Sequence, residues 1–173
     1  MVAVPLHPGL QCISQLFSYP AGQTVSVPLP EGAGAETEQL RAEMQAIDPI
    51  RLENEYVRLF INALPEVTCA PYGSVYLEGS VMGESTVKVA AVYQKYGIAT
   101  EVLADHIAVE SEFLAWLHGT AASDADAQKD YEYLLGHLRE WTGPFFSQID
   151  QHDQLGYYCH CAEFARQVLR SLE

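Results

Sequence analysis

The chain has 173 residues, of which 49% are hydrophobic, and its 23 acidic residues against 9 basic ones give a net charge of −14. A domain of this length buries roughly 70% of its unfolded surface, so its core needs neither disulfides nor metal ions. The composition excludes a disordered chain, and the negative charge argues against nucleic acid or an anionic membrane surface as a partner.

The sequence indicates neither a targeting segment nor disulfide-bonded cysteines. The first twenty residues lack a basic segment followed by an apolar run, which argues against a signal peptide. No stretch approaches the 18 uninterrupted apolar residues of a membrane span, so we expect a cytoplasmic protein without stable membrane insertion. The four cysteines, Cys12, Cys69, Cys159 and Cys161, are then expected to be reduced thiols.

Apolar periodicity and turn residues predict helices in the first half of the chain. The expected elements are a helix at 8–18, a connection at 20–35, a helix at 36–47, a helix from 49 to about 63 and an irregular segment at 65–83. Asp48-Pro49 is typical of a helix start, with an acid at the N-cap and proline at the first helical position. Pro65 is expected to end the helix that follows.

The second half of the chain is also predicted to be helical. The expected elements are helices from 84 or 85 to 96, from 106 to 117 or 118, at 124–141 and at about 155–171. Asp105 is expected to cap the second of these, Gly119 to close it, and Gly143-Pro144 to break the third. No segment alternates with the period of a strand, so we predict one all-α bundle of seven or more helices spanning residues 1–173.

The segment from Asp105 to Glu110 carries the most noticeable polar chemistry. His106 and Glu110 are four residues apart, so they share one helix face and can touch. They form either a surface pair beside an N-cap aspartate or a polar latch at the mouth of a cleft. A metal- or nucleotide-dependent enzyme using Asp105, His106 and Glu110 is an alternative, although no His-rich cluster supplies further metal ligands.

Other candidate chemistry is weaker. In Cys159-His160-Cys161, successive helical side chains point about 100° apart and cannot converge on one ion, so a structural role is favoured. No nucleophile elbow, phosphate-binding loop or dinucleotide fingerprint is present. We therefore predict no catalytic residue, no metal site and no cofactor.

The segment at 69–76 points to peptide binding instead. Tyr72 and Tyr76 offer flat apolar faces with polar tips on a segment expected to be irregular. For Tyr76, a plug in the core is an equally good interpretation. Between Leu59 and Gln128 the only basic residues are Lys88 and Lys95, so this region either carries ordinary solubility charge or would attract a cationic partner.

Several blocks, in this order, resemble the TorD/DmsD/NarJ family of redox-enzyme maturation chaperones, nearest to the TorD/DmsD branch. They are Glu55-Tyr56-Val57-Arg58-Leu59-Phe60, Ala70-Pro71-Tyr72-Gly73-Ser74-Val75-Tyr76-Leu77, Gly83-Glu84-Ser85-Thr86, Asp105-His106-Ile107-Ala108 with Glu110, and Phe113-Leu114-Ala115-Trp116-Leu117. The first four are similar to the family's E-Y-x-R-L-F, P-P-[YW]-x-S-V-Y, G-[DE]-S-T and E-P-x-D-H motifs. Ala70 replaces one proline, and Val102 and Leu103 replace the Glu and Pro of the last motif.

The resemblance implies a non-enzymatic chaperone that is a monomer or a domain-swapped dimer, with a hinge at about 97–105. Its partner would be the twin-arginine leader and apoprotein of a molybdopterin oxidoreductase catalytic subunit, whose cofactor insertion it assists and whose export it delays. The implied peptide site is Tyr72, Tyr76, Gly83, Asp105 and His106, to which we add Glu110. A helical assembly module without leader specificity is a second alternative.

The residues themselves fit such a partner. A twin-arginine leader carries two guanidinium groups and an apolar stretch, which complement an acidic edge beside an apolar surface. Asp105 is expected to hold one guanidinium in a partly exposed pair worth about 1 kcal/mol, so burial of the apolar stretch should supply most of the affinity.

Overall fold

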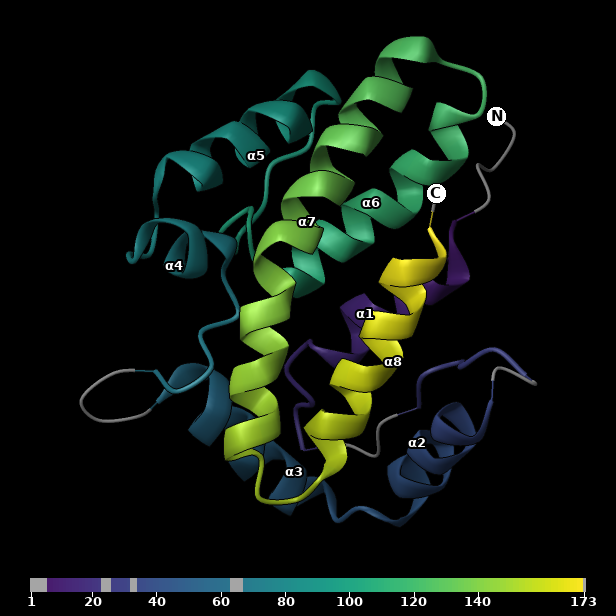
Figure 1. The fold of residues 1–173 in the computed structure, drawn as a ribbon, viewed down its shortest axis with the longest axis vertical. Coiled ribbons are helices and arrows are strands. Elements are labelled where there is room, and N and C mark those ends of the chain that lie inside the picture. Colours follow the sequence, from purple (N-terminus) through teal and green to yellow (C-terminus); the bar gives the residue numbers. More distant parts are fainter. Residues whose placement is uncertain (1–5, 23–25, 32–33, 63–66, 173) are drawn as a thin grey trace.

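The computed structural model describes residues 6–22, 26–31, 34–62 and 67–172, and these form a bundle of eight α-helices (Figure 1). The helices are α1 Pro8–Leu16, α2 Ala35–Ala46, α3 Pro49–Tyr56, α4 Gly73–Glu78, α5 Glu84–Lys95, α6 Ile107–Ala121, α7 Ala125–His152 and α8 Tyr157–Ser171. Within these ranges, β-type pairing is limited to an isolated bridge between Tyr72 and His106. The prediction of an all-α bundle is confirmed.

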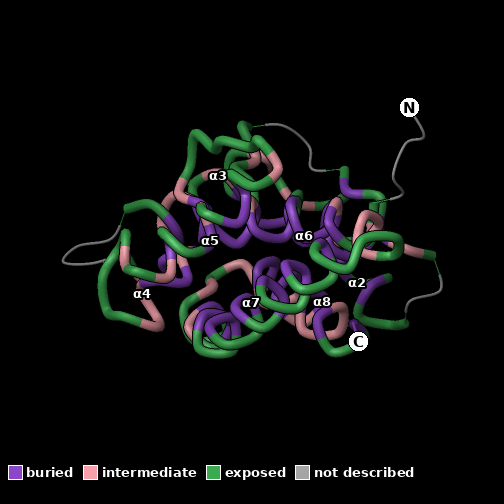
Figure 2. Tube along the Cα trace, turned by 90° about the horizontal axis from the view of Figure 1, so that it is seen from above, coloured by how far each residue is buried: buried purple, intermediate pink, exposed green. Residues whose placement is uncertain are grey.

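The long helix α7 runs along the length of the bundle, with α6 and α8 packed against it (Figure 1). Helix α1 packs against both α6 and α8, and α2 covers α8. Seen from above, the buried positions gather in the interior between these helices (Figure 2). An aromatic cluster of Phe17, Phe60, Phe145 and Tyr158 joins segments distant in sequence, with ring centroids 5.0–6.5 Å apart. Burial of these rings is a major source of stability.

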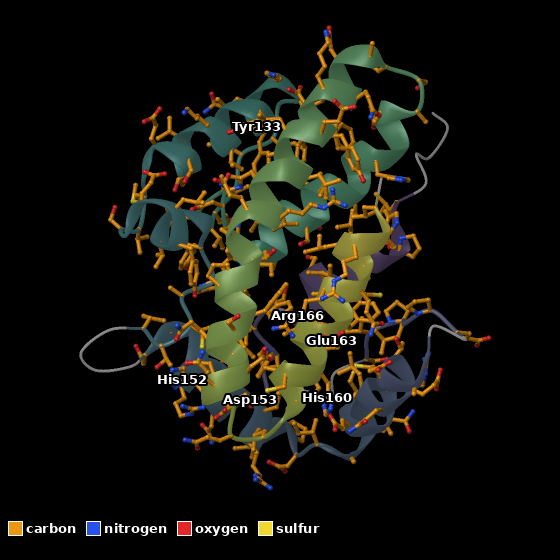
Figure 3. The ribbon with its side chains drawn as sticks, in the orientation of Figure 1. Tyr133, His152, Asp153, His160, Glu163 and Arg166 are labelled. Carbon is orange, nitrogen blue, oxygen red and sulfur yellow. The ribbon has the colours of Figure 1, made fainter. Side chains whose placement is uncertain are left out.

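The E-Y-x-R-L-F block clamps the turn between α7 and α8. Helix α3 continues into a π-helical turn at Val57–Ile61. The Glu55 carboxylate accepts hydrogen bonds from Arg58 Nε at 2.8 Å and from the Gln154 amide at 2.7 Å. His152 lies at this turn (Figure 3). Arg58 Nη2 donates a hydrogen bond to its carbonyl oxygen at 2.6 Å. The residues of the E-Y-x-R-L-F block therefore stabilise the fold at this turn.

One segment is more ordered than predicted. Residues 65–83 are expected to be irregular, yet they contain α4. The amide of Ser74 in its first turn donates to the Asp105 carboxylate, a partner 31 residues away that local sequence does not reveal. The predicted helix end at Ala63 and Pro65 lies outside the described residues.

Two helices extend beyond their predicted ends. Helix α6 passes Gly119, and α7 passes Pro144 and continues to His152. A proline inside a helix costs about 3 kcal/mol. However, Trp141, Phe145 and Ile149 are fully buried on both sides of Pro144, and burial of each such side chain contributes about 1.5–3 kcal/mol. Burial of these side chains thus outweighs the cost of Pro144, and the helix continues through it.

Other local signals are confirmed. The Asp48 carboxylate caps α3 by accepting from the Arg51 amide at 2.9 Å, and Gly97 follows α5 with φ 71°. All four cysteines are free. In the part of the chain that the structure describes, no helix is long and apolar enough to cross a membrane.

The clamp predicts a specific loss of stability. Arg58→Ala leaves the buried Glu55 carboxylate without its charged partner and should lower the free energy of unfolding by about 2 kcal/mol. Arg51→Ala, on the exposed side of the same helix, should change it by less than about 0.5 kcal/mol. Urea denaturation of both variants measures the difference, and equal stabilities would contradict the role of the clamp.

Candidate functional site

The P-Y-G-S and D-H blocks are joined directly in the structure. The Ile107 amide donates to the Pro71 carbonyl and the Gly73 amide to the Asp105 carbonyl, both at 3.0 Å. A third bond runs from the Ser74 amide to Asp105 Oδ2 at 2.8 Å. We call the segments 71–74 and 105–107 the motif junction. It fixes the start of α4 against the start of α6, so residues 31 apart in sequence form one unit.

Asp105 lies in the interior of this junction rather than at an exposed pocket edge. Its side chain is fully buried, and one carboxylate oxygen is occupied by Ser74. The other oxygen, Oδ1, is buried without a hydrogen-bond partner among the described residues. The expectation of a partly exposed Asp105 is therefore wrong, and its side chain instead accepts a hydrogen bond from the Ser74 amide in the first turn of α4.

His106, and not Asp105, is the N-cap of α6. Its Nδ1 accepts from the Ala108 amide at 3.1 Å, and the ring of Tyr72 packs edge-on against it with centroids 5.2 Å apart. Burial lowers the pKa of His106 to about 4, although Asp105 opposes this shift. A neutral imidazole is also what the cap requires, because a protonated ring nitrogen cannot accept a hydrogen bond.

Glu110 pairs with His137 of α7 and not with His106. Glu110 Oε1 lies 2.7 Å from His137 Nδ1, and the glutamate is fully buried. Burial raises the pKa of the Glu110 carboxyl, and His137 offsets this only in part. Burial alone would lower the pKa of His137, but the hydrogen bond and charge of Glu110 raise it overall. The predicted contact between His106 and Glu110 is therefore wrong, and Glu110 instead forms a buried link between α6 and α7.

Tyr76 and Gly73 pack against α7. The ring of Tyr76 is half-buried and stacks on Trp141, with centroids 5.9 Å apart. A Cβ on Gly73 would lie 2.9 Å from both His137 Cε1 and Trp141 Nε1, so only glycine allows this approach. The contact with Trp141 agrees with the interpretation of Tyr76 as a plug in the core. Part of the Tyr76 ring nevertheless remains accessible.

Gly83 is the N-cap of α5, and its role is to make room for Glu78. The Glu78 carboxylate accepts from the amides of Glu84 and Ser85, which satisfies the first turn of α5. A Cβ on Gly83 would collide with this carboxylate. The G-E-S-T block is thus a helix start capped from α4.

An apolar groove of about 610 Å³ borders the motif junction. It is lined by Leu6, Gln11, Tyr93, Ile98, Ala99, Thr100, Glu101, Val102, Val109, Glu112, Phe113 and Trp116. Tyr93 connects it to the junction, because its hydroxyl donates to the Ala104 carbonyl at 2.9 Å. Glu101 and Glu112 place negative charge beside the aromatic rings, as a cationic, apolar ligand requires.

Sequence reasoning missed most of this groove. Ile98 and Val102 belong to the connection between α5 and α6, where no periodicity marks them as apolar wall residues. Phe113 and Trp116 lie in a block of the family resemblance, but as helix residues they suggest the core. The exposure of Ile98 and Val102, 36% and 47%, is the feature that identifies the groove.

The structure does not assemble Asp105, His106 and Glu110 into a metal site. Each holds a different partner, namely Ser74, Ala108 and His137. In the described ranges, no group of three or more His, Cys, Asp or Glu side chains could hold a metal ion. His160 instead bonds Glu43 of α2 at 2.7 Å, which confirms a structural role for the C-H-C segment.

Comparison with known proteins agrees with this arrangement. The profile of the nitrate reductase delta subunit family matches residues 27–147. A candidate redox enzyme maturation protein from Archaeoglobus fulgidus has a similar crystal structure, with a TM-score of 0.63 and 25% identity over 93% of this chain and 92% of that one. No curated protein gave a significant sequence match.

The fold and these similarities define the class of the protein as a redox enzyme maturation chaperone. The chain belongs to the nitrate reductase delta subunit family, within the TorD/DmsD/NarJ group that its motifs resemble.

The junction predicts a hierarchy of substitutions at Asp105. Asp105→Ala removes the acceptor of the Ser74 amide and should lower the free energy of unfolding by about 2–3 kcal/mol. Asp105→Asn retains an oxygen acceptor and should cost less. Denaturant unfolding measures both, and an alanine variant as stable as the wild type would show that the junction does not depend on this carboxylate.

The lowered pKa of His106 predicts that the folded protein loses stability in acid. Because its folded-state pKa lies near 4, the unfolded chain binds the proton between the ordinary value of 6.5 and 4, and the folded chain does not. The free energy of unfolding should therefore fall by up to about 3 kcal/mol as pH drops through this interval. His106→Asn keeps an N-cap without titrating, so it should show a shallower pH slope. Identical slopes would contradict this assignment.

Proposed function

We propose that this chaperone binds the twin-arginine leader of the catalytic subunit of a molybdopterin oxidoreductase, and that the apolar groove holds the apolar stretch of the leader. In the cytoplasm, this binding would delay export and keep the apoprotein available for cofactor insertion. The observation that carries the proposal is the groove itself, a largely apolar surface with carboxylates at Glu101 and Glu112 beside the motif junction.

The size and chemistry of the groove support a peptide ligand. A volume of about 610 Å³ lies within the usual range for ligand sites and accommodates several apolar side chains. Burying apolar surface supplies most of the affinity, while exposed carboxylates contribute about 1 kcal/mol or less each and favour a cationic segment. The net charge of −14 adds long-range attraction for arginines.

The residues predicted from the sequence have different parts in this proposal. Asp105, His106 and Glu110 are buried, so we assign them a positioning role in which they hold α4, α6 and α7 in register. Tyr72 and Tyr76 are half-buried, and their accessible edges are available to the bound polypeptide. Gly83 acts through the start of α5.

The connection between α5 and α6 is the proposed hinge. Ile98, Ala99 and Thr100 line the apolar groove and also a second cavity of about 230 Å³, which Tyr93 and Gln94 border as well. A segment that borders two cavities has few packing contacts to break when it moves. A movement of residues 98–102 within this hinge would widen the groove and leave the bonds of Asp105 in the junction intact.

The groove is tested by removing its apolar wall without changing charge. Ile98→Asn combined with Val102→Asn should weaken binding of a peptide with two arginines and an apolar stretch by about tenfold or more. The matched control is Val81→Asn with Val87→Asn, two exposed valines outside the groove, which should leave affinity unchanged. Calorimetric titration measures both.

Two outcomes would contradict the proposal. Equal affinity of the groove variant and the wild type would exclude the groove as the binding surface. Equal binding of a peptide whose apolar stretch is replaced by serine and glycine would show that apolar burial does not drive recognition.

A further inference from the structure

A third cavity, of about 560 Å³, lies between α4, α5 and α7, and His137 of the Glu110–His137 pair is one of its lining residues. It shares no lining residue with the apolar groove. Its walls include Glu84 and Lys88 of α5 and Glu132, Tyr133, His137 and Glu140 of α7. Figure 3 shows Tyr133 on α7 where this helix faces α5. We call this the acidic cavity.

The charge of the acidic cavity is unbalanced. Four glutamates line it against one lysine, and that lysine, Lys88, is paired with Glu84 at 2.8 Å. The Glu78 carboxylate already binds the first turn of α5. Glu132 accepts a hydrogen bond only from the neutral amide of Gln128, at 2.8 Å. Glu132 and Glu140 therefore have no cationic partner among the described residues.

A buried histidine that lines the same cavity has a ring nitrogen without a partner among the described residues. His137 is 7% exposed, and its Nδ1 is held by Glu110 at 2.7 Å. Its Nε2 is buried and has no hydrogen-bond partner in the described part of the chain, although the side chain lines the cavity. Leaving such a nitrogen unpaired costs free energy, which a ligand that supplies a partner would recover.

The surroundings suit a guanidinium on a polypeptide. The ring of Tyr133, 41% exposed, offers a face on which a guanidinium can stack. The carboxylates of Glu132 and Glu140 offer acceptors for its planar donors. A peptide main chain carries both a carbonyl and an amide, so it can satisfy His137 Nε2 in either protonation state.

We propose that the acidic cavity binds an arginine-bearing stretch of the client polypeptide, with the guanidinium at Glu132, Glu140 and Tyr133 and a main-chain group at His137 Nε2. The identity of the partner as a client polypeptide rests on the proposed function. The site itself is separate from the apolar groove and is tested independently.

The two tryptophans distinguish the two surfaces. Trp116 lines the apolar groove, whereas Trp141 lies near His137, since a Cβ on Gly73 would be 2.9 Å from both Trp141 Nε1 and His137 Cε1. Their indole N–H signals in the NMR spectrum of the full-length, nitrogen-15-labelled protein can therefore be followed separately. The probe is the capped peptide Gly-Arg-Arg-Gly, which lacks any apolar side chain. It should shift the Trp141 signal and leave that of Trp116 in place.

Charge-neutral variants test the carboxylates. Glu132→Gln with Glu140→Gln should weaken binding of this peptide by about fivefold or more. Glu31→Gln with Glu36→Gln removes the same charge from two exposed positions elsewhere and should have little effect. Equal losses in both variants would mean that only the net charge attracts the peptide, and this result would overturn the proposal.

A glycine in the cavity wall provides a steric test that does not threaten the fold. Gly136 lines the cavity, and a Cβ there would meet no atom within 4 Å. Gly136→Gln should fill the cavity and abolish binding, while the better helix former maintains or raises stability. Gly143→Gln on the same helix also has open space at its Cβ and lies outside the cavity, so it should bind normally.

The remaining outcomes show which ligand the acidic cavity binds and whether it acts independently of the apolar groove. Gly-Gln-Gln-Gly binding as tightly as the arginine peptide, or a shift confined to Trp116, would overturn the proposal. Agmatine binding as tightly as the peptide would exclude a polypeptide ligand. If an apolar peptide fails to bind the groove while Gly-Arg-Arg-Gly still shifts Trp141, the leader-binding function fails and the acidic cavity stands.

Discussion

The structure depends on the hydrogen bonds that join segment 71–74 to segment 105–107 across the whole of α5. They place a fully buried aspartate at the start of α4 and make the neighbouring histidine the cap of α6. A buried carboxylate is tolerated only where its partners are fixed, so these bonds hold the starts of α4 and α6 in one arrangement. The Glu110–His137 pair extends the same constraint to α7.

These buried polar contacts are connected to two surfaces of different chemistry. Tyr93, which bonds the carbonyl of Ala104, lines an apolar groove bordered by the connection between α5 and α6. His137, the partner of Glu110, lines a cavity in which glutamates dominate. A chaperone for an unfolded segment needs apolar burial for affinity and charge for selectivity, and the two surfaces offer one of these each.

The sequence was sufficient for the all-α class, for the start of α3 at Asp48-Pro49 and for the family, because these depend on local patterns and on motif order. It was not sufficient where distant residues decide the outcome. Helix α4 depends on Asp105, and α7 passes Pro144 because buried aromatic residues lie on both sides. His137 is 27 residues from Glu110, so their pairing replaced the predicted contact with His106. The groove and cavity combine residues from separate helices, which no single motif marks.

The central claim is that the apolar groove receives the apolar stretch of a leader, and photocrosslinking tests it most directly. A benzophenone amino acid in the apolar stretch of a leader peptide is activated on the wild-type protein, and the crosslinked residues are identified by mass spectrometry. We expect crosslinks at Ile98, Val102 and Trp116, the accessible wall of the groove. Crosslinks concentrated on α2 or on the turn between α7 and α8, with none at these residues, would contradict the account.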